Sequence, residues 1–196
     1  MTDYLPLPDK QYSIIYADPP WKYGGGKNKK TFQGLASVHY ETMKTRDICA
    51  LPVKDIQAKG AVLFLWVTPP QLVEGIKVME AWGFKYKTVG FTWIKTNRDG
   101  SPFFGLGYWT RSNAEYCLIG VSGNHPKRTD NTVSQIVMTP KEAHSKKPDV
   151  VRERIVQLMG DLPRIELFAR QRADGWDAWG NEIKEEGREN NFGNMW

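Results

Sequence analysis

An aspartate, two prolines and a tryptophan follow directly on the apolar, strand-like run of residues 13–17, in the order Asp18-Pro19-Pro20-Trp21. These residue types suit a target that carries an exocyclic amine on a flat ring. The Asp18 carboxylate and the Pro19 carbonyl are two acceptors for the amine hydrogens, and the prolines restrict the backbone so that both acceptors keep their direction. Trp21 offers a flat face on which a base can stack. The alternative interpretation is a strand that ends in a proline-stiffened turn with a tryptophan of the core.

Four lysines surround the glycine run 24–26 directly after this turn. They are Lys22, Lys27, Lys29 and Lys30. The whole chain carries a net charge of +5, and positive charge beside a candidate site favours contact with nucleic-acid phosphates. The glycines predict a mobile loop over residues 22–38, and the polar, basic stretch 122–146 is expected to be mobile as well. For both segments, a solvated basic surface is the alternative.

The composition is that of an ordinary globular protein, with 196 residues of which 40% are hydrophobic and 25% charged. We expect one domain over residues 1–183 and a polar tail over 184–196. No segment resembles a membrane span or a signal peptide, which predicts a cytoplasmic protein. Cys49 and Cys117 are far apart beside apolar residues, so two buried free thiols are expected rather than a disulfide. The cysteines and histidines lack ligand spacing, and we expect no metal.

The hydrophobic pattern alternates between strands and helices. Strands are expected at 12–17, 61–67, 84–95, 115–121, 164–169 and 176–179. One helix is expected to begin after a cap at Thr68 and to end at Gly83, and another covers about 148–159 with Pro148 in its first turn. The pattern predicts an α/β sheet with helices on both faces, and such sheets bind ligands at the carboxyl ends of their strands, where Asp18 falls. There is no G-x-G-x-x-G sequence to support a nicotinamide or flavin site.

Six elements in this order resemble the MT-A70 family of S-adenosylmethionine-dependent adenine-N6 methyltransferases, over residues 12–183. They are the tetrad Asp18–Trp21, His39–Met43, Phe91–Asn97, the block Gly107–Gly120, Ser145–Asp149, and the block Glu166–Glu182. The resemblance implies a Rossmann-like class I methyltransferase sheet in which the catalytic strand precedes the cofactor strand. It also implies methyl transfer from S-adenosyl-L-methionine to the N6 amine of adenine.

The resemblance assigns roles to individual residues of this sequence. Asp18, Pro19, Pro20 and Trp21 form the catalytic turn, and Trp21 and Tyr40 flank the base. The expected cofactor-binding residues are Asp18, Ser145, Lys147, Glu166, Phe168, Arg170, Asn181 and Glu182. The expected substrate-binding residues are Tyr40, Lys22, Lys27, Lys29, Lys30, Trp109 and Arg111. Two alternatives stay open: Glu166 pairs with Arg170 as a structural ion pair, and Glu115 is an internal ion-pair partner rather than a site residue.

The compact chain resembles stand-alone bacterial or phage enzymes that act on DNA. RNA adenine is the first alternative substrate. The second alternative is a non-catalytic family member that binds nucleic acid or a partner subunit, against which the intact tetrad argues. The loops offer a small surface for a duplex, and for this reason we expect a homodimer on DNA.

Overall fold

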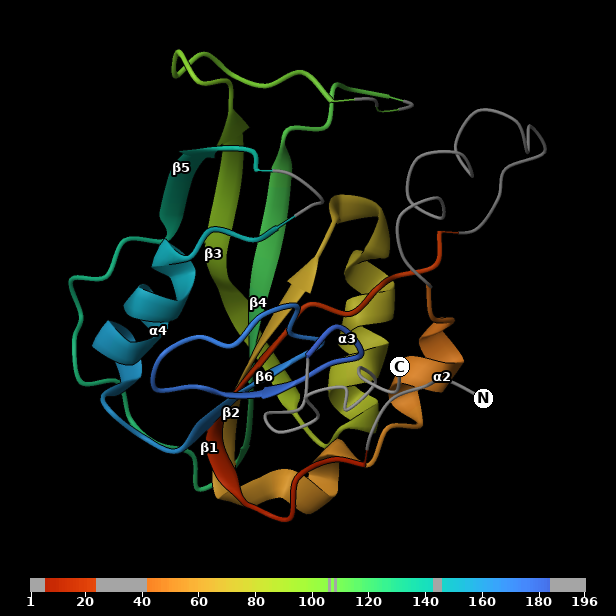
Figure 1. Cartoon of the computed structure of the whole chain (residues 1–196), viewed down its shortest axis with the longest axis vertical. Coiled ribbons are helices and arrows are strands. Elements are labelled where there is room, and N and C mark those ends of the chain that lie inside the picture. Colours follow the sequence, from red (N-terminus) through yellow and green to blue (C-terminus); the bar gives the residue numbers. More distant parts are fainter. Residues whose placement is uncertain (1–5, 24–41, 106, 108, 143–145, 184–196) are drawn as a thin grey trace, which may run out of the picture.

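The computed structural model describes residues 6–23, 42–105, 107, 109–142 and 146–183 (Figure 1). Several predicted site residues lie outside these ranges, namely Lys27, Lys29, Lys30, Tyr40 and Ser145. The predicted tail 184–196 and most of the loop 22–38 lie outside them too. The roles predicted for these residues stay predictions.

Within the described ranges, seven strands form one sheet in the order β5-β3-β4-β2-β1-β6-β7. Their bounds are β1 Tyr12–Ala17, β2 Gln57–Val67, β3 Lys85–Thr96, β4 Ala114–Gly123, β5 Ile136–Pro140, β6 Arg164–Leu167 and β7 Asp177–Trp179. Strand β4 pairs antiparallel with both β2 and β3, while all other neighbours pair in parallel. Therefore six strands end at one edge of the sheet, and β4 begins there.

The two central strands are apolar because both of their faces are covered. In β1, Ile14, Ile15, Tyr16 and Ala17 are each at most 1% exposed, and β2 is buried throughout residues 61–67. A strand between two layers of helices has no solvent-facing side, so its sequence is continuously apolar instead of alternating. The predicted strands 12–17 and 61–67 are confirmed, although β2 begins four residues earlier, at Gln57.

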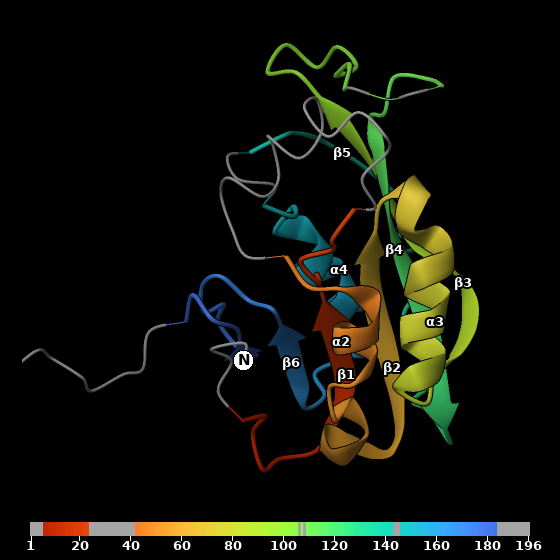
Figure 2. The ribbon, with the colours of Figure 1, turned by 90° about the vertical axis from the view of Figure 1, so that its right-hand side faces the viewer.

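Helices cover both faces of the sheet, as predicted (Figure 2). The helices α2, Thr45–Cys49, and α3, Leu72–Ala81, pack on one face together with the short turn Val53–Ile56. The helix α4, Val150–Met159, packs on the other face. The predicted helix stop at Gly83 is confirmed, since its φ of +84° is a conformation that glycine adopts without strain.

Two local predictions were wrong. No strand was predicted within the stretch 122–146, but β5 forms there and pairs with β3 at the sheet's edge. Pro148 lies just before the N-cap Asp149 of α4 instead of in its first turn. Thr68 is found at an N-cap position as predicted, but its side chain makes no cap hydrogen bond, and the short 3₁₀ turn Pro69–Gln71 stands between it and α3.

Two further observations concern the length of the helices and the state of the cysteines. No helix within the described ranges is long and apolar enough to cross a membrane. Both cysteines are free, with Cys117 buried and Cys49 partly buried.

Candidate active site

A pocket opens at the edge where β1, β2, β6 and β7 end. It encloses about 670 Å³, including the space that is open to solvent at its mouth. The lining residues are Asp18, Pro19, Pro20, Trp21, Tyr23, Trp66, Val67, Thr68, Glu115, Lys147, Phe168, Arg170, Asn181 and Glu182. Predicted catalytic and cofactor-binding residues from distant parts of the chain therefore line one cavity.

The turn after β1 is fixed by backbone hydrogen bonds. The Trp21 N–H donates to the Pro19 carbonyl at 2.9 Å. Met43 then pairs with the turn in parallel: its N–H donates to the Pro20 carbonyl at 2.8 Å, and its carbonyl accepts from the Lys22 N–H at 3.0 Å. The carbonyls of Pro19 and Pro20 thus each accept one hydrogen bond inside the protein, and each keeps one lone pair because a carbonyl oxygen accepts two hydrogen bonds.

Four charged side chains alternate in sign across the pocket. The Lys147 ammonium lies 2.7 Å from Oδ2 of Asp18 and 3.3 Å from Oε2 of Glu115. Glu115 in turn accepts a hydrogen bond from Lys95, at the carboxyl end of β3. Glu115 reaches this edge because β4 runs against the other strands, so its first residues lie beside the last residues of β3. The alternative assigned to Glu115, an internal ion-pair partner, is confirmed, and the residue also lines the pocket.

Burial and pairing set the protonation of this group. Burial raises the pKa of Asp18, and the ammonium of Lys147 acts in the opposite direction. Burial also acts to raise the pKa of Glu115, but Lys147 and Lys95 outweigh it, and the net pKa of Glu115 is lowered. Burial acts to lower the pKa of Lys147, yet its two carboxylate partners raise it above the usual value. Lys147 and Glu115 are therefore charged at neutral pH, and Asp18 is the member whose ionisation is most easily changed.

The two aromatic residues near the turn have different environments. Trp21 is 6% exposed, and its indole Nε1 donates to the Trp66 carbonyl at 3.0 Å, so most of this ring belongs to the core. Tyr23 is 41% exposed, and its hydroxyl lies 3.0 Å from Oγ1 of Thr68. The interpretation of Trp21 as an open stacking face does not agree with this burial. Sequence reasoning missed Tyr23 because nothing in the tetrad points to the second residue after it.

The loops after β6 and β7 form the other wall of the pocket. Phe168, directly after β6, has a φ of +62°, which is uncommon for a residue with a side chain, and its ring packs against Trp179. A Cβ on Gly180 would lie 2.1 Å from the Ala169 carbonyl oxygen, so the two loops approach as closely as only glycine permits. Arg170 lies near Glu182, with 3.8 Å between Nε and Oε1.

Glu166 does not line the pocket. Its carboxylate accepts two hydrogen bonds from Arg152 of α4, at 2.9 and 3.2 Å, and both side chains are only 12–13% exposed. Burial raises the pKa of Glu166, and Arg152 opposes that rise. The predicted cofactor role is therefore not supported by its position. The alternative pairing with Arg170 was also wrong, since Arg152 is the partner of Glu166 and Arg170 lies near Glu182.

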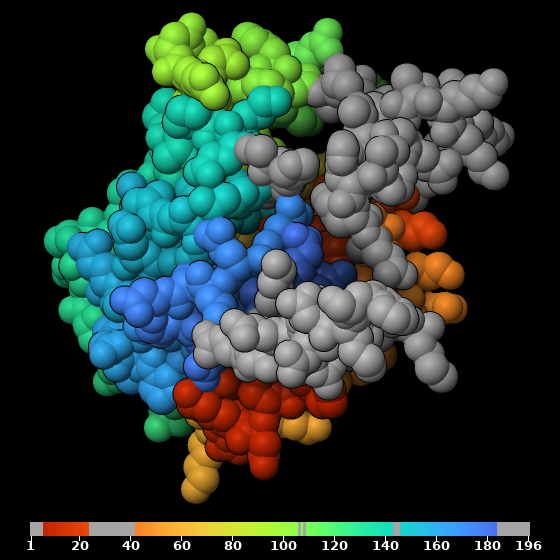
Figure 3. All heavy atoms as spheres, viewed as in Figure 1, coloured from red at the N-terminus to blue at the C-terminus, as the bar shows by residue number. Residues whose placement is uncertain are grey.

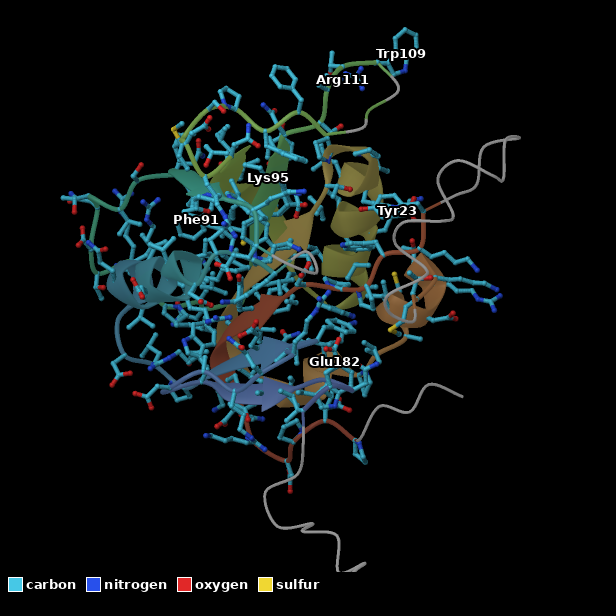
Figure 4. The ribbon with its side chains drawn as sticks, turned by 45° about the horizontal axis from the view of Figure 1, so that its top comes forward. Tyr23, Phe91, Lys95, Trp109, Arg111 and Glu182 are labelled. Carbon is cyan, nitrogen blue, oxygen red and sulfur yellow. The ribbon has the colours of Figure 1, made fainter. Side chains whose placement is uncertain are left out.

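Trp109 and Arg111 lie outside the pocket. They belong to the long connection between β3 and β4, which projects beyond the edge of the sheet in Figure 1 and forms the light-green top of the molecule in Figure 3. Trp109 is 99% exposed, and both side chains lie at the outer end of this connection, well away from Tyr23 and Glu182 (Figure 4). Lys22 is exposed and is not among the residues that line the pocket, while its carbonyl accepts a long hydrogen bond from Gln71.

The described residues contain no group of three or more His, Cys, Asp or Glu side chains arranged to hold a metal ion. The charged side chains that line the pocket instead pair with one another: Lys147 lies between Asp18 and Glu115, and Arg170 lies near Glu182. The absence of a metal in the reaction stays a prediction.

The parallel core of the sheet, its single antiparallel strand, and a pocket at the strand ends together define a Rossmann-like methyltransferase fold. The model of the MT-A70 family matches residues 12–182, and the chain belongs to this family. It is accordingly a methyltransferase, and S-adenosylmethionine is its methyl donor.

Individual relatives differ greatly in length. The chain is similar to the type II methyltransferase M.MunI of a Mycoplasma species, with 38% identity over 192 residues that cover 90% of this chain and 80% of the relative. It is 29% identical to the N(6)-adenosine-methyltransferase MT-A70-like protein of Arabidopsis thaliana, over 88% of this chain but 24% of that protein. It is 26% identical to the human N(6)-adenosine-methyltransferase catalytic subunit METTL3, over 88% of this chain and 28% of the subunit. The chain thus spans about a quarter of these eukaryotic relatives.

Proposed function

We propose that this methyltransferase transfers the methyl group of S-adenosylmethionine to the N6 amine of adenine in DNA. The observation that carries the proposal is the turn Asp18–Trp21, which directly follows β1 and whose four residues all line the pocket, so that both the Asp18 carboxylate and the Pro19 carbonyl belong to its wall. Two acceptors on one rigid turn match the two hydrogens of an exocyclic amine.

The amine needs activation because its lone pair is delocalised into the adenine ring. Hydrogen bonds from its two hydrogens to Asp18 and to the remaining lone pair of Pro19 draw the nitrogen toward tetrahedral geometry and localise its lone pair. The Lys147 bond goes to Oδ2 of Asp18, so the carboxylate has a second oxygen with which to meet the amine. Such positioning and electrostatic effects are each worth several kcal/mol, about 3–4 for one well-placed hydrogen bond. Asp18 is also the nearest base for the released proton, although methylation itself acidifies the amine.

The residues after β6 and β7 suit S-adenosylmethionine, which supplies a methyl group on a positively charged sulfur. The Arg170 guanidinium matches a carboxylate, the Glu182 carboxylate matches ribose hydroxyls or an ammonium group, and the Asn181 amide serves either. Phe168 supplies an apolar surface. The same wall lacks a glycine-rich phosphate loop, and S-adenosylmethionine has no phosphate. Ser145 stays a proposed cofactor contact outside the described residues.

DNA is favoured over RNA by the extent of the similarity. The chain covers 80% of the bacterial type II methyltransferase, whereas it covers only about a quarter of the relatives named for N(6)-adenosine. RNA adenine is retained as the second candidate because those N(6)-adenosine-methyltransferases share 26–29% identity over 88% of this chain. A cytoplasmic location and a homodimer on duplex DNA accompany the proposal as predictions.

Contacts with the nucleic acid are proposed for two regions. The exposed pair Trp109 and Arg111 would lie along the strand, and the lysine-rich loop after Lys22 would contact phosphates. Replacing Lys27, Lys29 and Lys30 together with Gln should weaken binding to all sequences alike and reduce the slope of affinity against salt by about 0.9 for each lost phosphate contact. An unchanged slope would assign these lysines to solubility alone.

The experiment that tests the function measures transfer of a labelled methyl group to DNA and RNA oligonucleotides of the same sequence, with the modified base identified by mass spectrometry. N6-methyladenine in DNA is the expected product. Asp18→Asn removes the negative charge at nearly constant shape and should lower turnover by about 100-fold or more while cofactor binding stays. Asp55→Asn, at an exposed position away from the pocket, is the matched control. Methylation of RNA alone, or unchanged turnover of Asp18→Asn, would contradict the proposal.

A further inference from the structure

The catalytic turn carries a second aromatic residue with a more accessible ring than that of the tetrad. A base that stacks on a side chain needs an open face of about its own size. Trp21 lacks one, because it is 6% exposed and its indole N–H is held by the Trp66 carbonyl. The other rings that line the pocket, Trp66 and Phe168, are 0% and 8% exposed. Tyr23, at 41%, is the most exposed aromatic residue among the described residues that line this pocket.

The hydroxyl of Tyr23 is hydrogen-bonded to another residue that lines the pocket. It forms a 3.0 Å hydrogen bond with Oγ1 of Thr68, the residue that follows β2, and Thr68 also lines the pocket. The neighbouring carbonyl of Lys22 accepts a 3.4 Å hydrogen bond from the Gln71 side chain. Two contacts thus attach the segment after the tetrad to the β2–α3 connection. The Thr68 hydroxyl serves this contact in place of the helix cap that its sequence position predicts.

A ring that is fixed before the ligand arrives binds at a lower entropic cost. Ordering one side chain at an interface costs about 0.5–1.5 kcal/mol, and the Thr68 contact removes part of that cost from the binding step. Tyr23 also lies four residues after Pro19 and five after Asp18, on the same short segment. A base held on this ring is therefore placed against the acceptors of its amine by one rigid piece of backbone.

We propose that Tyr23 is the stacking wall for the target base, and that Thr68 positions it. The role assigned to Trp21 is then to hold the turn in the core. This inference rests on the proposed function, since it concerns the base whose amine is methylated. Tyr23 follows the tetrad after β1, whereas Phe168 and Arg170 of the proposed cofactor wall follow β6. The proposed stacking wall and the proposed cofactor wall are therefore separate parts of the pocket.

The test compares Tyr23→Leu, which removes the ring, with Tyr23→Phe, which keeps the ring and removes the contact with Thr68. The matched control is Tyr86→Leu, because Tyr86 is 37% exposed near the start of β3, at the opposite edge of the sheet. Base stacking is worth about 1–3 kcal/mol, so Tyr23→Leu should raise the KM for the oligonucleotide by about 5-fold to 150-fold. Tyr23→Phe and Thr68→Val should each raise it by about 2-fold to 10-fold, the size of one hydrogen bond.

Three further measurements separate stacking from a structural effect. Affinity for S-adenosylmethionine and the melting temperature should be unchanged in every variant, and kcat should change less than KM. A 2-aminopurine at the target position should be brighter with Tyr23→Leu than with the wild type, because the aromatic face that quenches it is gone. An equal KM for Tyr23→Leu and Tyr86→Leu, or unchanged 2-aminopurine fluorescence, would overturn the inference while wild-type methylation stands. Absence of methylation by the wild type would contradict the proposed function itself.

Discussion

Removal of the Lys147 ammonium is the perturbation that most directly tests the electrostatics of the pocket. Lys147 is 11% exposed and lies between two carboxylates, at 2.7 Å from Asp18 and 3.3 Å from Glu115. Lys147→Met keeps the length of the side chain and removes the charge. Glu115 keeps Lys95 as a partner, whereas Asp18 loses the ammonium that holds its pKa down against burial.

The magnitude follows from the distance and the burial. An opposite charge in contact lowers the pKa of an aspartate, so removal of the ammonium should raise the pKa of Asp18 further above its ordinary value. A hydrogen bond to a charged group contributes about 1.5–3 kcal/mol, and the ionised form of Asp18 loses an interaction of this size. Since the amine needs the ionised carboxylate, the direction is a loss of activity at neutral pH that is recovered as the pH rises.

The assay is the pH dependence of kcat/KM for the oligonucleotide, which reports the ionisation of the free enzyme. In Lys147→Met the acidic limb should move to higher pH, because the pKa of Asp18 is no longer held down by the ammonium. Lys147→Arg should keep the limb close to that of the wild type. Lys146→Met is the control, because this neighbouring lysine pairs with Glu142 and Asp149 instead of the pocket. If the activity of Lys147→Met falls by the same factor at every pH, then Lys147 does not control the ionisation of Asp18 and acts only in binding.

Other substitutions test separate parts of the structure. Arg152→Met leaves the buried Glu166 without its partner and should lower the free energy of unfolding in urea by about 3–5 kcal/mol. The control Arg46→Met removes an exposed ion pair and should change that free energy by less than about 1 kcal/mol. Equal losses in the two variants would contradict the argument from burial. Gly180→Ala should weaken the affinity for S-adenosylmethionine, measured by calorimetry, by at least about tenfold. The reason is that the Cβ of the new alanine meets the Ala169 carbonyl and moves the proposed cofactor wall. Unchanged affinity would show that the loops adapt to the extra methyl group. Trp109→Ala should weaken oligonucleotide binding by about 1–3 kcal/mol with an unchanged melting temperature, and an unchanged dissociation constant would remove Trp109 from the nucleic-acid path.

The sequence predicted the elements whose signal is local. The continuous apolar runs of β1 and β2 identify strands covered on both faces, and the ends of such strands meet at one edge of a sheet. This is why Asp18 could be placed at a ligand site before its surroundings were known.

The remaining features depend on pairing across long separations. The Lys95–Glu115–Lys147 contacts require the reversed direction of β4, which no local pattern encodes. Glu166 looked like a site residue because it stands at a strand end, but α4 supplies Arg152 on that face. The short strand β5 was missed because an edge strand of five residues that ends in proline carries little periodic signal.

The position of β1 between β2 and β6 also governs when the enzyme becomes active during its synthesis. Its register with β6 joins Ile14 to Arg164, and Ala17 to Leu167, so the second side of β1 stays unpaired until the ribosome has made most of the chain. At about 5–20 residues per second, the turn after β1 waits about 7–30 seconds for the strand beside it. A nascent chain that ends before β6 has the proposed acceptors for the amine but lacks the proposed cofactor wall with Arg170, and we expect it to transfer no methyl group. The order of the strands therefore ties the proposed catalysis to the synthesis of β6 and β7.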